Sequence, residues 1–252
     1  MTEVCLQPKE SISLILDSSN TDFLANYSPA IQLRKDKQYE IALVNLETYY
    51  SFPNIDKKNN IFRYSIDNGA NWNEIEIPEG SYELKQINSE IFRIMKSRGH
   101  YDRTTNKGYI NISANLATLR CILQIMDSKY QVDFSHQRSL SVILGYEKKI
   151  ISSPYNEGTS TVNILTINSI LVECSLIQGS YLNSSKEPII YSFFPKCLPG
   201  EKIIETPKNL IYLPVNTNDK IDYIHIRLKD NSGKLLNLRG EKITLRLHLK
   251  ES

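Results

Sequence analysis

Histidines and carboxylates are the side chains whose spacing would first indicate catalysis or metal binding. The chain has four histidines, which are His100, His136, His225 and His248. Neither His100 nor His136 has a Cys, Asp or Glu three or four residues further on, as a zinc site would suggest. The other two alternate with apolar residues, so we expect exposed imidazoles on strands. His100 and Asp102 share a polar loop and could form an unrecognised hydrolase site, but a general acid–base pair needs further partners that the sequence does not indicate.

Other patterns that carry chemistry are absent from the sequence. There is no Gly-x-Ser-x-Gly nucleophile motif, no phosphate-binding loop and no dinucleotide-binding fingerprint. The cysteines are far apart and predict reduced thiols: Cys5, Cys121, Cys174 and Cys197. Glu74 and Glu76 lie on one face of an alternating segment, which is typical of a solvated strand. The sequence therefore predicts a protein that is not an enzyme and that needs no cofactor or metal.

One aromatic cluster favours an alternative function. The chain has fifteen tyrosines, and Tyr49, Tyr50 and Phe52 form the tightest aromatic group. Such a group could line a shallow groove of a β-sandwich module that binds carbohydrate or a host receptor without catalysis. Tyrosines also fill half-buried strand positions with a wet hydroxyl, so the cluster alone does not decide between the two interpretations.

Composition and charge describe an ordinary globular protein. The 252 residues are 40% hydrophobic and 23% charged, with 30 Lys and Arg against 28 Asp and Glu, a formal net charge of +2. This balance gives no global basic field of the kind that attracts nucleic acid. Residues 220–252 are locally basic, with eight Lys or Arg against four Asp or Glu. No apolar run approaches 18 residues and no signal-peptide pattern is present, so we expect neither a membrane span nor secretion.

Period-two alternation of apolar and polar residues dominates the chain and predicts antiparallel strands. Turn signals, such as Asn68-Gly69 and the segment 230–233, separate these runs. The predicted strands are 11–17, 29–34, 38–48, 60–66, 72–77, 109–115, 119–125, 161–177, 187–194, 221–229 and 240–249. The pattern indicates an all-β protein.

Two segments have helical spacing instead. Residues 82–97 predict an amphipathic helix, with Ser81 as N-cap and Gly99 just beyond its end. Residues 137–144 predict a second, shorter helix that ends at Gly145. Residues 97–108 are polar and predict a mobile loop, and residues 1–10 predict a flexible N-terminal arm. Because no repeat or linker divides the chain, we expect one domain over residues 1–252.

Several segments together resemble a known family. They are residues 39–47, 68–69 with Trp72, 77–84, 87–88, 139–146, 179–183, 209–215, 227–230, 233–235 and 238–249. Their order and spacing resemble the penton, or minor capsid, proteins of Polinton/Maverick elements and adintovirus-like DNA viruses, from about residue 11 to residue 250. The C-terminal string from Arg239 to Leu249 is the most specific of these matches.

The resemblance implies a fold, a function and a location. It implies a single antiparallel jelly-roll β-sandwich with one or two short helices. Five copies would form a homopentamer at the fivefold vertices of an icosahedral capsid, among double jelly-roll major capsid proteins. The protein would be synthesised in the host cytoplasm, assembled there or in the nucleus, and found in the virion. A chain of 252 residues would leave little room for an outer insertion domain or a second barrel.

The family has no catalytic residues to carry over, and its shared positions are structural. They are Trp72, Gly145, Tyr181, Tyr212, Pro214, Arg239, Gly240, Glu241 and His248. Gly145 suits a position that needs a positive φ, and Trp72 suits a core or interface anchor. The alternating charges of Arg239, Glu241 and Lys242 would suit lateral contacts between protomers. For the basic C-terminal segment, with Lys234, Arg239 and Lys242, there are two interpretations: a solvated face, which its small charge excess favours, or, as a hypothesis, an inner surface that touches packaged DNA.

Overall fold

The protein folds into two compact units. The computed structural model describes residues 9–164, 167–217 and 219–252. Unit 1 consists of Met1–Phe52 and Ile167–Ser252, and unit 2 consists of Pro53–Thr166. The sequence predicts one domain over residues 1–252 with little room for an insertion, whereas the chain inserts unit 2 as a second body within unit 1. Residues 1–8 of the expected N-terminal arm lie outside the described residues.

One sheet of unit 1 has its strands in the order β1, β20, β3 and β17, all antiparallel. Their bounds are β1 (Ser11–Ser18), β20 (Ile243–Glu251), β3 (Tyr39–Tyr49) and β17 (Lys202–Glu205). The short strand β18 (Leu213–Pro214) pairs with the beginning of β3. We call this sheet A.

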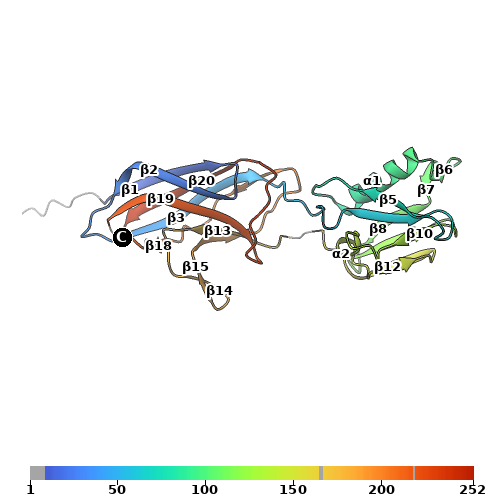
Figure 1. The fold of residues 1–252 in the computed structure, drawn as a ribbon. Coiled ribbons are helices and arrows are strands. Elements are labelled where there is room, and N and C mark those ends of the chain that lie inside the picture. Colours follow the sequence, from blue (N-terminus) through green and yellow to red (C-terminus); the bar gives the residue numbers. More distant parts are fainter. Residues whose placement is uncertain (1–8, 165–166, 218) are drawn as a thin grey trace, which may run out of the picture. The chain divides into compact units, whose positions relative to one another are not determined.

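The second sheet of unit 1, sheet B, has the order β16, β13, β19 and β2. Its strands are also antiparallel: β16 (Ile189–Phe193), β13 (Ile170–Cys174), β19 (Lys220–Asp230) and β2 (Asp22–Gln32). Between β13 and β16 lies a hairpin of β14 (Ser180–Leu182) and β15 (Ser185–Glu187), which projects from the sandwich (Figure 1).

The strand order of the two sheets is that of a jelly roll. Numbered along the chain, the eight strands are β1, β2, β3, β13, β16, β17, β19 and β20. Sheet A then reads first, eighth, third and sixth, and sheet B reads fifth, fourth, seventh and second. Figure 1 shows the N-terminal strands β1 to β3 beside the C-terminal strands β19 and β20. This order is the double Greek key of an eight-stranded jelly roll, which confirms the predicted fold class. Unit 2 is inserted between the third and fourth strands.

Alternation along the strands builds the core of unit 1. In β20, every second side chain from Ile243 to Leu249 is buried, and the residues between are polar or charged. Strand β19 buries Ile224, Ile226 and Leu228 in the same way. Because each strand turns one apolar face inward, the two sheets enclose a single hydrophobic cluster. The alternation therefore accounts for the part of the core that β19 and β20 supply.

Unit 2 has a separate core between two smaller antiparallel sheets and a helix. One sheet contains β11 (Ile150–Ile151), β10 (Gln131–Asp133), β4 (Ile61–Ser65) and β5 (Asn73–Glu76), in that order. The other contains β12 (Tyr155–Thr161), β9 (Arg120–Ile125) and β8 (Ile110–Asn115). A hairpin of β6 (Tyr101–Asp102) and β7 (Lys107–Gly108) follows the helix. A core of its own explains why residues 53–166 form a distinct unit.

The predicted long helix is present as α1 (Leu84–Ser97). Its apolar stripe is buried, namely Leu84, Ile87, Ile91 and Met95. The N-cap is Glu83 and not Ser81, because the Gln86 side chain accepts the Glu83 backbone N–H at 2.8 Å. Gly99 adopts φ +77° just beyond the last turn, as predicted.

The second helix is shorter than predicted. It is α2 (Ser141–Leu144), and Gly145 ends it with φ +73°. A Cβ atom at Gly145 would lie 2.3 Å from the Ser160 carbonyl oxygen. The position therefore requires glycine for two reasons, its left-handed backbone and the close approach of a neighbouring strand.

Other sequence predictions differ from the structure. The predicted strand 161–177 is wrong, since β12 ends at Thr161 in unit 2 and β13 begins at Ile170 in unit 1. Residues 97–108, expected as a loop, contain the β6–β7 hairpin. Strand β2 begins at Asp22, well before the predicted residue 29. The prediction missed its first half because the alternating residues there are only half-buried and give a weak pattern.

Candidate assembly surfaces

Tyr212 and His248 are brought together on sheet A. The Tyr212 hydroxyl lies 2.6 Å from His248 Nδ1, and the Ser11 hydroxyl lies 2.7 Å from His248 Nε2. The Lys250 ammonium lies 3.8 Å from the centroid of the Tyr212 ring, in a cation–π contact. His248 is opposite Ala42 in the register, and Ala42 is fully buried. The cluster thus fixes the segment before β18 to the sheet.

The Ser11–His248 pair has the spacing of a nucleophile and its base, which raises the question of catalysis. In a catalytic triad the third group is a carboxylate that stabilises the imidazolium. Here that place is taken by the Tyr212 hydroxyl, which is a phenol and not a carboxylate. The arrangement therefore differs from a catalytic triad, and its hydrogen bonds hold the segment before β18 against the sheet.

Tyr181 lines a groove beside Tyr212. It belongs to the β14–β15 hairpin and is 68% exposed. The groove has a volume of about 340 Å³ and is lined by β14, β16, Leu171, Ile211 and Leu213. Ile211 is 64% exposed. Exposed apolar side chains around a groove are typical of surfaces that contact another protein.

Unit 1 presents two opposite flanks. Strands β1 and β2 are joined by residues 19–21 and form the edges of the two sheets on one side, which we call the first flank. Strands β16 and β17 form the opposite edges, and together with the β14–β15 hairpin they make the second flank. The first flank carries the exposed side chains Ile15 and Leu24. Both flanks therefore combine open strand edges with exposed apolar groups. Edges of this kind pair with other chains unless a specific partner covers them.

The two flanks differ in charge. Residues 11–32, which contain the first flank, include two aspartates and no Lys or Arg. Residues 180–205, which contain the second flank, include three lysines and three glutamates. On the first flank Asp22 is already paired with His225 at 2.5 Å, whereas Asp17 makes no ion pair within the described residues. The first flank is therefore weakly acidic, whereas the charges of the second flank balance.

The remaining predicted site residues lie in separate places. Trp72 is half-buried beside β5 in unit 2, with the Arg63 guanidinium 5.4 Å from its ring. Gly145 ends α2, also in unit 2. Pro214 lies in β18, opposite Glu40. The exposed residues Arg239, Gly240 and Glu241 form the turn before β20, with Arg239 and Gly240 at φ 54° and 82°. The structure thus brings together Tyr212 and His248, with Pro214 close by in the chain, and not the full predicted set.

The aromatic groove expected at residues 49–52 is not formed as predicted. Tyr50 and Phe52 are buried in the core of unit 1, and only Tyr49 is exposed. Their rings pack against each other with centroids 5.0 Å apart. Side chains that fill a core cannot stack on a sugar at the surface, so this cluster does not provide the binding groove of the alternative function.

His100 and Asp102 have separate partners. His100 Nδ1 lies 2.8 Å from the Tyr64 hydroxyl, and burial lowers the pKa of its imidazole, with a further contribution from the Arg98 guanidinium. Asp102 accepts hydrogen bonds from the Thr104 backbone and from the Thr105 hydroxyl, which lower the pKa of its carboxyl. Each side chain is held by local contacts, and the two are not arranged as an acid–base pair.

The described cysteines are free thiols, and two of them are fully buried. Burial raises the pKa of Cys121 to about 12 and that of Cys174 to about 11. Cys197 is partly buried, and Cys5 lies outside the described residues. A thiol with a raised pKa forms little thiolate and is a poor nucleophile.

Among the residues that the structure describes, no three His, Cys, Asp or Glu side chains are grouped as metal ligands. No helix in the same residues is long and apolar enough to cross a membrane.

The fold defines the chain as an eight-stranded antiparallel jelly-roll protein with a second unit inserted between its third and fourth strands. A solved structure with a similar fold is the crystal structure of the mavirus penton protein, with a TM-score of 0.51 and 11% sequence identity. The match covers 97% of this chain and 100% of the penton protein. No protein-family model and no curated protein matches the sequence.

Proposed function

We propose that this protein is a structural capsid protein of the penton class and that it has no catalytic function. The observation that carries the proposal is the shared fold with the mavirus penton protein over nearly the whole of both chains, so that the inserted unit 2 is included in the match. The sequence resemblance to Polinton/Maverick and adintovirus-like pentons supports the same function independently of the structure.

Five copies would form a ring at each fivefold vertex of an icosahedral capsid. A cyclic ring requires that one side of each protomer bind the opposite side of its neighbour. The first and second flanks of unit 1 suit this requirement, because they lie at opposite edges of the sandwich and both expose apolar side chains. The charged turn with Arg239, Glu241 and Lys242 is exposed and is available for additional lateral contacts.

The surrounding partners follow from the same proposal. The pentamer would fit among double jelly-roll major capsid proteins, and the protein would be located in the virion after synthesis in the host cytoplasm and assembly there or in the nucleus. Lys234, Arg239 and Lys242 are exposed and make no ion pair within the described part of the chain, so they could contact packaged DNA on the inner face. Reversing their charge without any loss of genome packaging would exclude that contact.

Mass photometry of the full chain over a range of concentrations tests the oligomeric state. The proposal predicts a species of about five times 29.0 kDa that persists on dilution. A monomer at every concentration, or a closed trimer, would contradict the pentamer and leave only the shared fold.

A further inference from the structure

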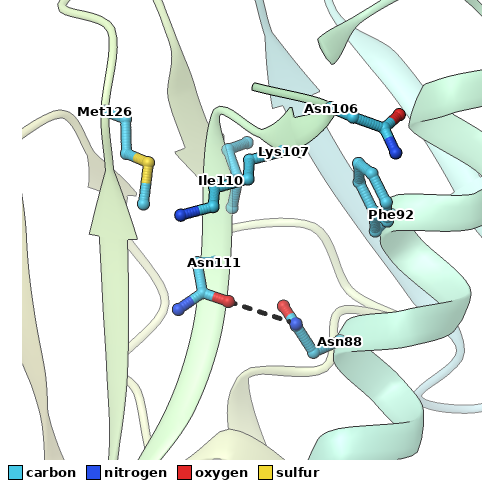
Figure 2. Close-up of a pocket in the computed structure, with 8 residues that line it drawn as sticks. Asn88, Phe92, Asn106, Lys107, Ile110, Asn111 and Met126 are labelled. Atoms are coloured by element: carbon cyan, nitrogen blue, oxygen red, sulfur yellow. Dashed lines mark hydrogen bonds between the residues drawn. The ribbon is translucent and has the colours of Figure 1, made fainter. Parts of the chain in front are cut away.

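Unit 2 contains a pocket that the capsid function does not use. It lies between α1, the β6–β7 hairpin and β8, and its volume is about 370 Å³ (Figure 2). Its lining includes Asn88, Phe92, Asn106, Lys107, Asn111 and Met126. A pocket of this size is in the range of small-molecule sites, which combine apolar walls with a few fixed polar groups.

A chain of side-chain amides is fixed along one side of this pocket. Asn88 Oδ1 accepts the Ile112 backbone N–H at 2.7 Å, and Asn88 Nδ2 donates to Asn111 Oδ1 at 3.2 Å. Asn111 Nδ2 in turn donates to Gln124 Oε1 at 3.2 Å. Each amide nitrogen has two N–H groups, and these bonds use one of them on Asn88 and one on Asn111. The chain thus orients the amides and leaves a donor on each for a ligand.

The opposite side of the pocket is positively charged. Lys107 and Asn106 come from the β6–β7 hairpin, and neither side chain has a hydrogen-bond or ion-pair partner within residues 9–164. Lys96 at the end of α1 lies 5.9 Å from the Phe92 ring. Lys107 is the charged side chain among the residues that line the pocket. An ammonium group without an ion-pair partner attracts an anionic ligand.

Apolar groups complete the wall. Figure 2 shows the ring of Phe92, a residue of α1, next to Asn106, and shows Met126 on the other side of the pocket. Gly108 leaves space beside the ring, since a Cβ there would lie 3.0 Å from Phe92. An aromatic ring and a thioether provide surface for the C–H face of a ligand.

We propose that this pocket binds an acidic saccharide, with its carboxylate or sulfate at Lys107 and its hydroxyl groups on the amides of Asn88, Asn106 and Asn111. Hydroxyl groups both donate and accept hydrogen bonds, as side-chain amides do, so the two are matched. The apolar wall would contact the C–H face of the sugar ring. The same chemistry is offered by a terminal sialic acid and by a sulfated glycosaminoglycan, and the experiment distinguishes these two sources.

Binding of three sugars to the full-length protein tests the proposal. The probes are 3′-sialyllactose, a heparin-derived tetrasaccharide and neutral lactose, measured by titration with NMR or biolayer interferometry. We expect saturable binding of one acidic probe, at least tenfold tighter than lactose. The probe that binds identifies the source as sialic acid or as sulfated glycan. If neither acidic probe binds, or if lactose binds equally well, the proposal is wrong.

Two variants locate the site and one controls for charge. Lys107→Glu reverses the charge at the pocket, and Asn106→Asp adds a negative charge with almost no change in size at a residue with φ 55°, a conformation that Asp also tolerates. Both should weaken acidic-sugar binding at least tenfold and leave the thermal transition unchanged. Lys148→Glu changes another exposed lysine of unit 2 outside the pocket and should alter binding less than twofold. Equal losses in all three variants, or equally tight binding of a DNA oligonucleotide, would show a non-specific charge effect and overturn the proposal.

Discussion

Tyr212 and His248 are joined by a hydrogen bond of 2.6 Å between the phenol oxygen and Nδ1, although 36 residues separate them in the chain. The bond links the segment before β18 to β20, one of the inner strands of sheet A. The ring of Tyr212 also receives the Lys250 ammonium, two residues further along β20. One aromatic side chain therefore fixes the irregular segment between β17 and β18 to the regular sheet.

Replacing Tyr212 with Phe tests the contribution of this bond. The variant keeps the ring and its cation–π contact but loses the hydroxyl, so we expect a loss of about 1 kcal/mol in the free energy of unfolding, as is typical of one hydrogen bond. Urea denaturation of the full chain measures the change. Tyr181→Phe is the matched control, because Tyr181 is 68% exposed and its hydroxyl has no hydrogen-bond partner among the described residues. Equal stability of the two variants would show that the Tyr212 bond contributes nothing.

Gly145 and Gly240 allow a matched comparison of two left-handed glycines. At Gly240, φ is +82° and no atom lies within 4 Å of an added Cβ, so Gly240→Ala should cost only the backbone term, about 1 to 2 kcal/mol. At Gly145, the added Cβ would also lie 2.3 Å from the Ser160 carbonyl oxygen. Gly145→Ala should therefore cost about 3 kcal/mol or more. Denaturation with urea should rank the variants in this order, and a reversed order would refute the structural basis given for Gly145.

Much of unit 1 could be predicted from the sequence because its information is local. Alternation from Ile224 to Leu228 in β19 and from Ile243 to Leu249 in β20 identifies both the strands and the face that each one buries. The 3.6-residue spacing of Leu84, Ile87 and Ile91 identifies α1 in the same way. These patterns involve residues close together in the chain, so no knowledge of the tertiary structure is needed to interpret them.

The remaining features depend on contacts between distant residues. Ser11, Tyr212 and His248 meet only because β1 pairs with β20 and β18 pairs with β3, which no local pattern reveals. The boundary of unit 2 is equally hidden, since alternation continues on both sides of it without a change in composition. Tyr50 and Phe52 have the composition of a surface groove, and only the packing of unit 1 places them in a core.

His100 should make unit 2 sensitive to mild acid. Burial, and secondarily Arg98, lower the pKa of its imidazole below the ordinary value of 6.5. The unfolded chain then binds the proton more tightly than the folded chain, so the contribution to stability is present above pH 6.5 and is lost as pH falls through the lowered pKa.

His100→Asn keeps a polar group near Tyr64 but cannot titrate. We expect the wild type to lose more thermal stability than this variant between pH 7.5 and pH 5.5. An NMR titration that gave His100 a pKa at or above its ordinary value would contradict this explanation.

Blocking one flank at a time tests the proposed direction of assembly. Ile15→Arg places a charge on the first flank and Tyr181→Arg places one on the second flank, at side chains that are 60% and 68% exposed. Burying an unpaired charge in an interface is costly, so each variant alone should fail to form rings. Because each retains one intact flank and the two flanks bind each other, an equimolar mixture should give a heterodimer of about twice 29.0 kDa and nothing larger.

Ile150→Arg, at a 54% exposed residue of unit 2, is the matched control and should still form the pentamer. Mass photometry distinguishes these species; rings formed by either flank variant, or pentamers in the mixture, would exclude head-to-tail contact between these two flanks.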